Sequence, residues 1–228
     1  MKFFNKTYLW AVIILISGVT YVGCTHDDDI APSAGTKIER GSAAFTSGVD
    51  KWKLDKTHSS VLWETAYMGS GGLLTGRFNS FGVTSMSFEE SNPEKISFEG
   101  WVRLNTVNTG EPGRDGGCLL GTFGTAAGLT DEANNLATLK SKKVEFSKSD
   151  KGYIVTFDMT FMGKTKEITG KLNYVPKTTI PASGTAAEYN IFGLKLDYQF
   201  FAKSDFGIVS NSIADKVGVS VNMNFNNK

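Results

Sequence analysis

The chain has 228 residues, enough for one sizeable β domain or two small ones. Its formal net charge is only +1, so no surface field of one sign attracts nucleic acid, and that class of partner is disfavoured. Glycine (25) and phenylalanine (16) are abundant while proline (5) is rare, which favours many twisted strands joined by tight turns.

The first 23 residues have the pattern of a secretory signal peptide. Lys2 and Lys6 flank the start of an uncharged apolar run that ends just before Cys24. A cysteine at the cleavage point resembles a bacterial lipoprotein signal, in which that cysteine is acylated and becomes the new N-terminus. Tyr21 stands where such signals usually have leucine. We expect a signal peptide over residues 1–23 and a lipid anchor on Cys24, with an ordinary signal peptide or membrane anchor as the alternative.

The next segment, residues 24–50, lacks hydrophobic periodicity and is expected to be the lipidated N-terminus followed by a flexible tether. Three consecutive acidic residues, Asp27 to Asp29, resemble the export signal that places some bacterial lipoproteins on the cell surface. A plain solvated charge run is the alternative. The expected location is the cell envelope, as an outer-membrane lipoprotein facing the periplasm or the cell surface.

From residue 51 onward, apolar residues alternate with the period of two that is typical of strands. The first such segment follows a polar corner at residues 55–60, and the cleanest apolar face runs from Tyr153 to Phe161. Only one segment looks helical: Thr130 can cap a short helix that ends near Lys140. One-sided stripes occur around residues 61–67, 73–81, 83–88, 98–106, 153–161, 168–174, 194–202 and 217–225.

These stripes predict an all-β domain over residues 51–228. Most connections are too short for parallel crossovers, so the sheet should be antiparallel. Closure into a barrel removes exposed edges, and about eight strands leave room for one ligand. We therefore expect an extended antiparallel β-barrel of about eight strands with one short helix. A sandwich with a fully packed core would give the same periodicity, so an open cavity and a packed core both remain possible.

Several dispersed motifs resemble the YceI-like, polyisoprenoid-binding family. The opening Trp52, Asp55 and His58-Ser59 are similar to the family's first strand. Its other matching elements are residues 75–78 (a Gly-Arg-Phe segment), 104–115 (a loop ending in Arg-Asp), 152–166 (a hairpin with G-x-T-K), 204–208 (an Asp-Phe-Gly element) and 215–221 (a closing strand). Residues 116–119 and 203–204, both in polar elements, depart from the family pattern.

The resemblance implies a lipocalin-like barrel that holds a long isoprenoid chain, a quinone tail or a polyprenyl lipid, in its lumen. A carrier or sink of this kind has no chemistry of its own, and no cofactor or metal is expected. The residues expected to contact the lipid are Trp63, Phe78, Phe81, Tyr153, Val155, Phe157, Met159, Phe161, Leu172, Leu196, Tyr198, Phe200 and Phe206. Some of them are expected to be plain core instead.

Four polar residues are candidates for the head group or the cavity mouth: His58, Arg77, Arg114 and Asp115. A histidine bonded to Asp55 at the strand corner, and an ion pair between Arg114 and Asp115, are the structural alternatives. His58 has no second histidine or cysteine placed to share a metal, and no G-x-S-x-G elbow is present. An enzyme is therefore not expected. The alternative function is a packed β-barrel that serves as a surface interaction module without a small ligand.

Overall fold

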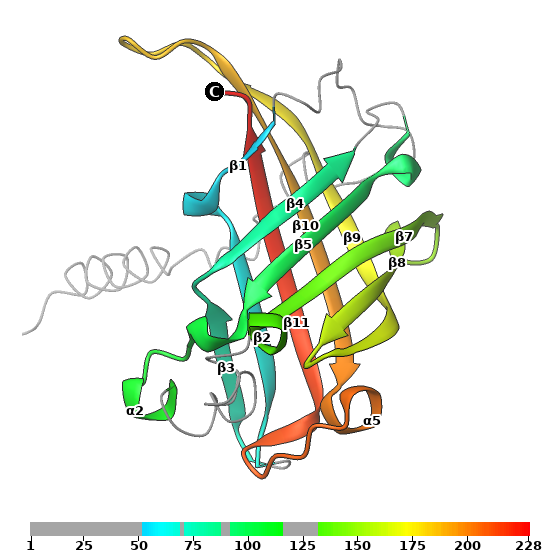
Figure 1. The fold of residues 1–228 in the computed structure, drawn as a ribbon. Coiled ribbons are helices and arrows are strands. Elements are labelled where there is room, and N and C mark those ends of the chain that lie inside the picture. Colours follow the sequence, from blue (N-terminus) through cyan, green and yellow to red (C-terminus); the bar gives the residue numbers. More distant parts are fainter. Residues whose placement is uncertain (1–51, 69–70, 88–91, 116–131) are drawn as a thin grey trace, which may run out of the picture. The chain divides into compact units, whose positions relative to one another are not determined.

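The computed structural model describes residues 52–68, 71–87, 92–115 and 132–228 (Figure 1). The predicted signal peptide, the Cys24 anchor and the tether lie outside these residues, as does Thr130.

A single antiparallel sheet contains the strands of the described residues, in the order β4-β5-β7-β8-β9-β10-β11-β2-β3-β6, with β1 beside β11. This confirms the predicted fold class, although the sheet has eleven strands rather than about eight. The long strands are β2 (Ser60–Tyr67), β3 (Leu73–Phe78), β4 (Phe81–Ser87), β5 (Ser97–Arg103), β7 (Leu136–Ser147), β8 (Gly152–Phe161), β9 (Lys164–Ile180), β10 (Tyr189–Phe201) and β11 (Ile213–Asn226); the short ones are β1 (Lys53–Leu54) and β6 (Val107–Asn108).

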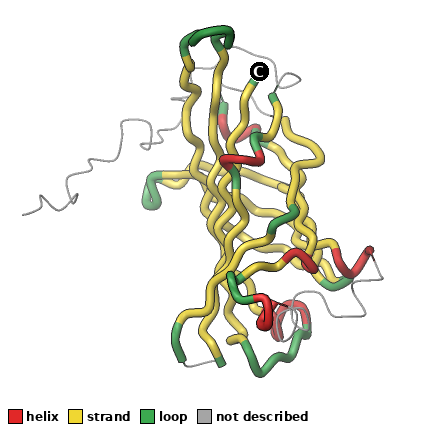
Figure 2. Tube along the Cα trace, turned by 90° about the vertical axis from the view of Figure 1, so that its left-hand side faces the viewer, coloured by secondary structure: helices red, strands yellow, loops and turns green. Residues whose placement is uncertain are grey.

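The two ends of this sheet belong to one bent ribbon, so the sheet curls round on itself (Figures 1 and 2). β3 runs into β4 across Asn79 and Ser80, and β5 runs into β6 across the 3-10 turn η6 (Leu104–Thr106). At the corner, the Asn79 amide donates to the Thr106 carbonyl (3.0 Å) and the Arg103 amide donates to the Ser80 carbonyl (2.9 Å). The Ser80 amide donates to Thr106 Oγ1 (3.0 Å). These bonds replace the ladder that the corner interrupts.

Besides η6, the helices of the described residues are short and lie between strands: η4 (Lys56–His58), η5 (Pro93–Lys95), α2 (Pro112–Arg114), α4 (Glu132–Asn135) and α5 (Ala202–Phe206). The predicted helix up to Lys140 is wrong beyond Asn135, because β7 begins at Leu136. Ala137 pairs with Val102 of β5 and is buried. Burial between two neighbouring strands outweighs the weak helical preference of this segment.

The interior is formed by alternate residues of the strands, as the stripes predict. On β8, every second side chain from Tyr153 to Phe161 is buried. On β11 the same holds from Val217 to Phe225. The two stripes belong to opposite halves of the sheet order, so they enclose the interior from different sides.

Candidate functional site

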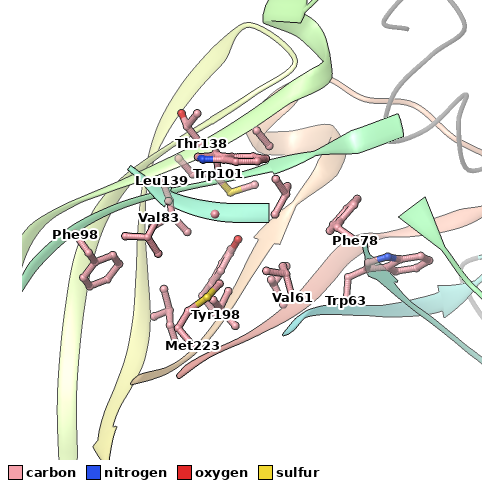
Figure 3. Close-up of a pocket in the computed structure, with 18 of the residues that line it drawn as sticks. Val61, Trp63, Phe78, Val83, Phe98, Trp101, Thr138, Leu139, Tyr198 and Met223 are labelled. Carbon is pink, nitrogen blue, oxygen red and sulfur yellow. The ribbon is translucent and has the colours of Figure 1, made fainter. Parts of the chain in front are cut away.

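An apolar cavity lies inside the curled sheet (Figure 3). It is a narrow slot. The volume open to the centre of a water molecule is about 80 Å³, and the total atom-free space, which includes the opening to solvent, is about 930 Å³. The lining residues are Val61, Trp63, Phe78, Gly82, Val83, Met86, Phe98, Gly100, Trp101, Val102, Leu104, Ala137, Thr138, Leu139, Met159, Phe161, Leu172, Leu194, Leu196, Tyr198, Phe200, Val217, Val219, Val221, Met223 and Phe225.

The chemistry of this lining suits a hydrocarbon. Among these described residues there is no carboxylate, amine or guanidinium, and the hydroxyl groups are those of Thr138 and Tyr198. A bound chain in such a cavity gains about 0.8 kcal/mol for each methylene removed from water. A charged group in the same place would lose its hydration without a partner. The cavity therefore selects for apolar ligands.

One wall of the cavity is more open than the other. Lining residues of β4 and β5, such as Val83, Met86 and Phe98, are only partly buried, whereas those of β11 are buried. In Figure 3, Val83 and Phe98 lie on one side of the cavity, and Val61 and Trp63 lie toward the other. The β4–β5 wall is therefore the more exposed side of the slot.

An aromatic cluster near α5 closes one end of the cavity. Phe161 and Phe200 line the cavity, and Phe206 of α5 packs behind them with ring centroids 5.4 and 5.5 Å away. The backbone amide of Phe201 donates to Asp205 Oδ2 (2.7 Å), and Gly207 ends the helix with φ +72°. These contacts hold α5 in the position where Phe206 covers the end of the cavity.

A second aromatic cluster closes the other end. Phe225 lines the cavity and stacks on Phe192 with centroids 4.8 Å apart. Trp52 meets the same Phe192 ring edge-on at 4.7 Å, and Tyr174 lies 6.1 Å away. Each cluster includes a residue of β10, Phe200 in the first and Phe192 in the second, so the slot runs along this strand between them.

The structure divides the thirteen predicted lipid contacts into two groups. The residues that line the cavity are Trp63, Phe78, Met159, Phe161, Leu172, Leu196, Tyr198 and Phe200. The remaining five are buried in the hydrophobic core without lining it: Phe81, Tyr153, Val155, Phe157 and Phe206. Phe157 supports the site indirectly, because its ring packs edge-on against Tyr198 at 5.0 Å.

Of the four polar candidates, His58 has the contact expected of a structural residue. Its side chain is 73% exposed, and Nδ1 lies 2.9 Å from Asp55 Oδ2. The His58 carbonyl accepts a hydrogen bond from Asn224 Nδ2. The Asp55 carboxylate also accepts from the Thr57 and His58 amides, and its bond to the His58 ring is the main reason why its pKa lies below the usual value. This pair ties the corner before β2 to β11.

The other three candidates also lie away from the cavity lining. Arg77 is exposed on β3, where it pairs with Asn108 of β6, and Arg114 is exposed in α2. Asp115 accepts hydrogen bonds from the Thr109 amide (2.9 Å) and hydroxyl (2.7 Å), so it holds its own loop.

Several lining residues were absent from the predicted set. Val219, Val221 and Met223 belong to the β11 stripe, whose period was visible in the sequence. Trp101 is different, because it lies on the outward-facing alternation of β5 and covers Gly82, where a Cβ atom would come within 2.8 Å of its indole. Two cations flank Trp101: Lys56 Nζ is 5.9 Å and Arg103 Cζ 5.8 Å from its ring centroid. The contact with Lys56 comes from a distant segment, so no local pattern reveals it.

Neither a metal centre nor a helix that could span a membrane occurs among the residues that the structure describes. No three histidine, cysteine or acidic side chains in that part of the chain gather as a metal site would require. No helix there is long and apolar enough to cross a bilayer.

A family model for the YceI-like domain matches residues 52–226. The chain belongs to the YceI-like family. The match spans the whole sheet from β1 to β11, and so includes both walls of the cavity and both aromatic clusters. No curated protein matches the chain.

Solved structures share this YceI-like fold. BcnA of Burkholderia cenocepacia superposes with a TM-score of 0.56 at 16% identity, covering 75% of this chain and 99% of BcnA. A polyisoprenoid binding domain from Saccharophagus degradans gives 0.51 at 17% identity, covering 77% and 97%. The YceI protein of Campylobacter jejuni gives 0.53 at 19% identity, covering 81% and 99%. At these identities the likeness shows a common fold.

Proposed function

We propose that this YceI-like domain binds one long isoprenoid lipid, a quinone tail or a polyprenyl chain, inside its cavity. The observation that carries the proposal is the continuous uncharged lining between the two aromatic clusters. The Saccharophagus degradans relative, which is described as a polyisoprenoid binding domain, supports the same ligand class. A carrier or storage role follows, because a binding site of this kind offers the lipid shelter from water without changing it.

The energetics favour a long chain over a short one. Each methylene contributes about 0.8 kcal/mol, whereas the loss of translational and rotational freedom is incurred once per ligand. Ordering a flexible chain adds a cost for each rotor, so the net gain per carbon is smaller than the transfer value. For a prenyl chain that fills the slot, the summed gain from its methylenes therefore exceeds the fixed cost of binding. Such a lipid is expected to stay bound during purification.

The place of action in this proposal is the cell envelope. Acylation of Cys24 would anchor the domain to the outer membrane, and residues 25–50 would act as its tether. Such an anchor keeps a lipid-binding domain next to the membrane that supplies its ligand. The partners are then the isoprenoid lipid and the membrane, with no enzymatic activity of the domain itself.

Native mass spectrometry of the full chain tests the proposal. We expect one prenyl lipid or isoprenoid quinone per chain. Val219→Phe fills the slot from β11 and should lower lipid occupancy. Val209→Phe makes the same change at a side chain that is 77% exposed, so it should keep the lipid. An empty wild-type protein that also takes up neither menaquinone nor a polyprenyl lipid from detergent would contradict the proposal and favour the surface interaction module.

A further inference from the structure

The Tyr198 hydroxyl is a polar group within a cavity that is otherwise built for hydrocarbon. Tyr198 belongs to the inward stripe of β10, between Leu196 and Phe200, and its ring packs against Phe157. Figure 3 shows the ring projecting into the cavity with the oxygen at its free end. The hydroxyl is therefore placed where a ligand lies, rather than at the protein surface.

Within the described residues, no hydrogen bond involves the Tyr198 hydroxyl, and the Tyr198 ring packs edge-on against Phe157. Burial raises the pKa of Tyr198 far above its usual value, so the phenol keeps its proton and remains a donor. The Tyr198 side chain is partly buried among apolar lining residues, so a ligand oxygen beside its hydroxyl would give this donor an acceptor that the surrounding lining does not supply. A ligand made only of carbon and hydrogen cannot do this.

The Thr138 hydroxyl, the other one in the cavity lining, is not placed to make the same contact with a ligand. Thr138 lies on β7 opposite Trp101 of β5, and both are partly exposed. Figure 3 shows Thr138 beside Trp101, with the strands between them and the Tyr198 ring. Tyr198 is partly exposed as well, so the two hydroxyls differ in their position and not in their burial. Tyr198 is thus the residue that can discriminate between ligands by their oxygen atoms.

We propose that Tyr198 is a specificity-determining residue that donates a hydrogen bond to a carbonyl oxygen of the bound lipid. The preferred ligand is then a prenyl lipid with a carbonyl-bearing ring that enters the slot and lies beside Tyr198, instead of remaining at the mouth. The inference rests on the proposed function, since it presupposes that the cavity takes a prenyl chain. It adds the ligand's polar group and the orientation in which the chain is held.

The test compares one carbonyl-bearing and one hydrocarbon probe on the full chain: menaquinone-4 and squalene. Binding of menaquinone-4 is followed by quenching of tryptophan fluorescence, because Trp63 lines the cavity, and squalene by its displacement of menaquinone-4. Tyr198→Phe removes one oxygen and keeps the ring that contacts Phe157. We expect it to weaken menaquinone-4 binding about tenfold and to leave squalene binding unchanged. Tyr67→Phe, at a side chain that is 48% exposed, is the matched control and should change neither.

The outcomes separate this inference from the function on which it rests. If the wild-type protein binds neither probe, the cavity is not a prenyl-lipid site and both proposals fall. If both probes bind, and Tyr198→Phe weakens them equally or leaves menaquinone-4 unaffected, the lipid site stands and the role of Tyr198 is overturned. A thermal melt of each variant ensures that a change in affinity is not a change in folding.

Discussion

The indole ring of Trp63 lies across the backbone of Gly76 on the adjacent strand. A Cβ atom built on Gly76 would come within 2.5 Å of Trp63 Cζ2, a distance that real structures do not allow. The two residues are direct partners in the β2–β3 ladder, so neither can slide away from the other. Because Trp63 also lines the cavity, the missing side chain at Gly76 helps to set the shape of the site.

This relationship predicts that Gly76→Ala displaces the Trp63 ring. The variant should lose about 1–3 kcal/mol of unfolding free energy, as is usual when a packed core receives an extra carbon. Urea denaturation measures the loss, and a shift of the tryptophan emission spectrum reports the displacement. Gly72→Ala, where a Cβ would meet nothing within 4 Å, is the control and should behave like the wild type. Equal stability of the two variants would contradict the packing described.

The aromatic plug at α5 predicts that Phe206→Ala is strongly destabilising. Phe206 is 2% exposed and contacts the rings of Phe161 and Phe200, so its removal leaves a cavity at the end of the slot. Such truncations cost about 3–5 kcal/mol. Phe201→Ala, at a side chain that is 46% exposed, should cost much less. Thermal unfolding of the pair measures the difference, and similar melting temperatures would show that Phe206 does not close the interior.

The Asp55–His58 pair predicts a loss of stability in acid. The pKa of Asp55 is lower in the folded chain than its ordinary value, so folding favours the charged carboxylate. Its contribution to stability is therefore complete above the unfolded pKa of about 3.9 and is lost as the pH falls through the lower folded value. The unfolding free energies of wild type and Asp55→Asn should differ by a constant amount above about pH 5 and converge below about pH 4. Two curves that stay parallel down to pH 2.5 would rule out this linkage.

The N-terminal pattern predicts that Cys24→Ala prevents lipid anchoring. The variant should leave the membrane fraction or remain unprocessed, because the acylated residue is gone. Cys118→Ala changes the other cysteine of the chain and should leave fractionation unchanged. Recovery of Cys24→Ala in membranes at the normal mature mass would show that something other than this cysteine holds the protein there.

The strands were predictable because burial on one face imposes a period of two, which β8 shows from Tyr153 to Phe161 and β11 from Val217 to Phe225. Where helical signals compete with the period of two, the prediction from the sequence is wrong. This happens at Leu136, whose segment forms a strand because β5 and β8 pair with it. The corner at Asn79 and Ser80 has no such signature, since its bonds come from Arg103 and Thr106 on a segment farther along the chain.

The sequence predicted only part of the cavity lining, for a related reason. Phe157 and Tyr198 both belong to inward stripes, yet Tyr198 lines the slot and Phe157 lies behind it. Alternation tells which face of a strand is buried, but not how far along the strand the packed core gives way to open space. The point at which packed core gives way to open space depends on the opposite wall, whose residues come from β4 and β5.

The position of β11 between β10 and β2 means that the first and last long strands of the described chain are neighbours. The amide of Asn224 donates to Ser59 Oγ (2.9 Å), a contact between residues 165 positions apart. A chain that emerges N-terminus first therefore keeps the edge of β2 unpaired until almost all of its length has arrived. Such an edge can pair with other chains in the meantime. Protection of this edge during assembly therefore depends on how quickly β11, the final strand with fourteen residues, pairs with it.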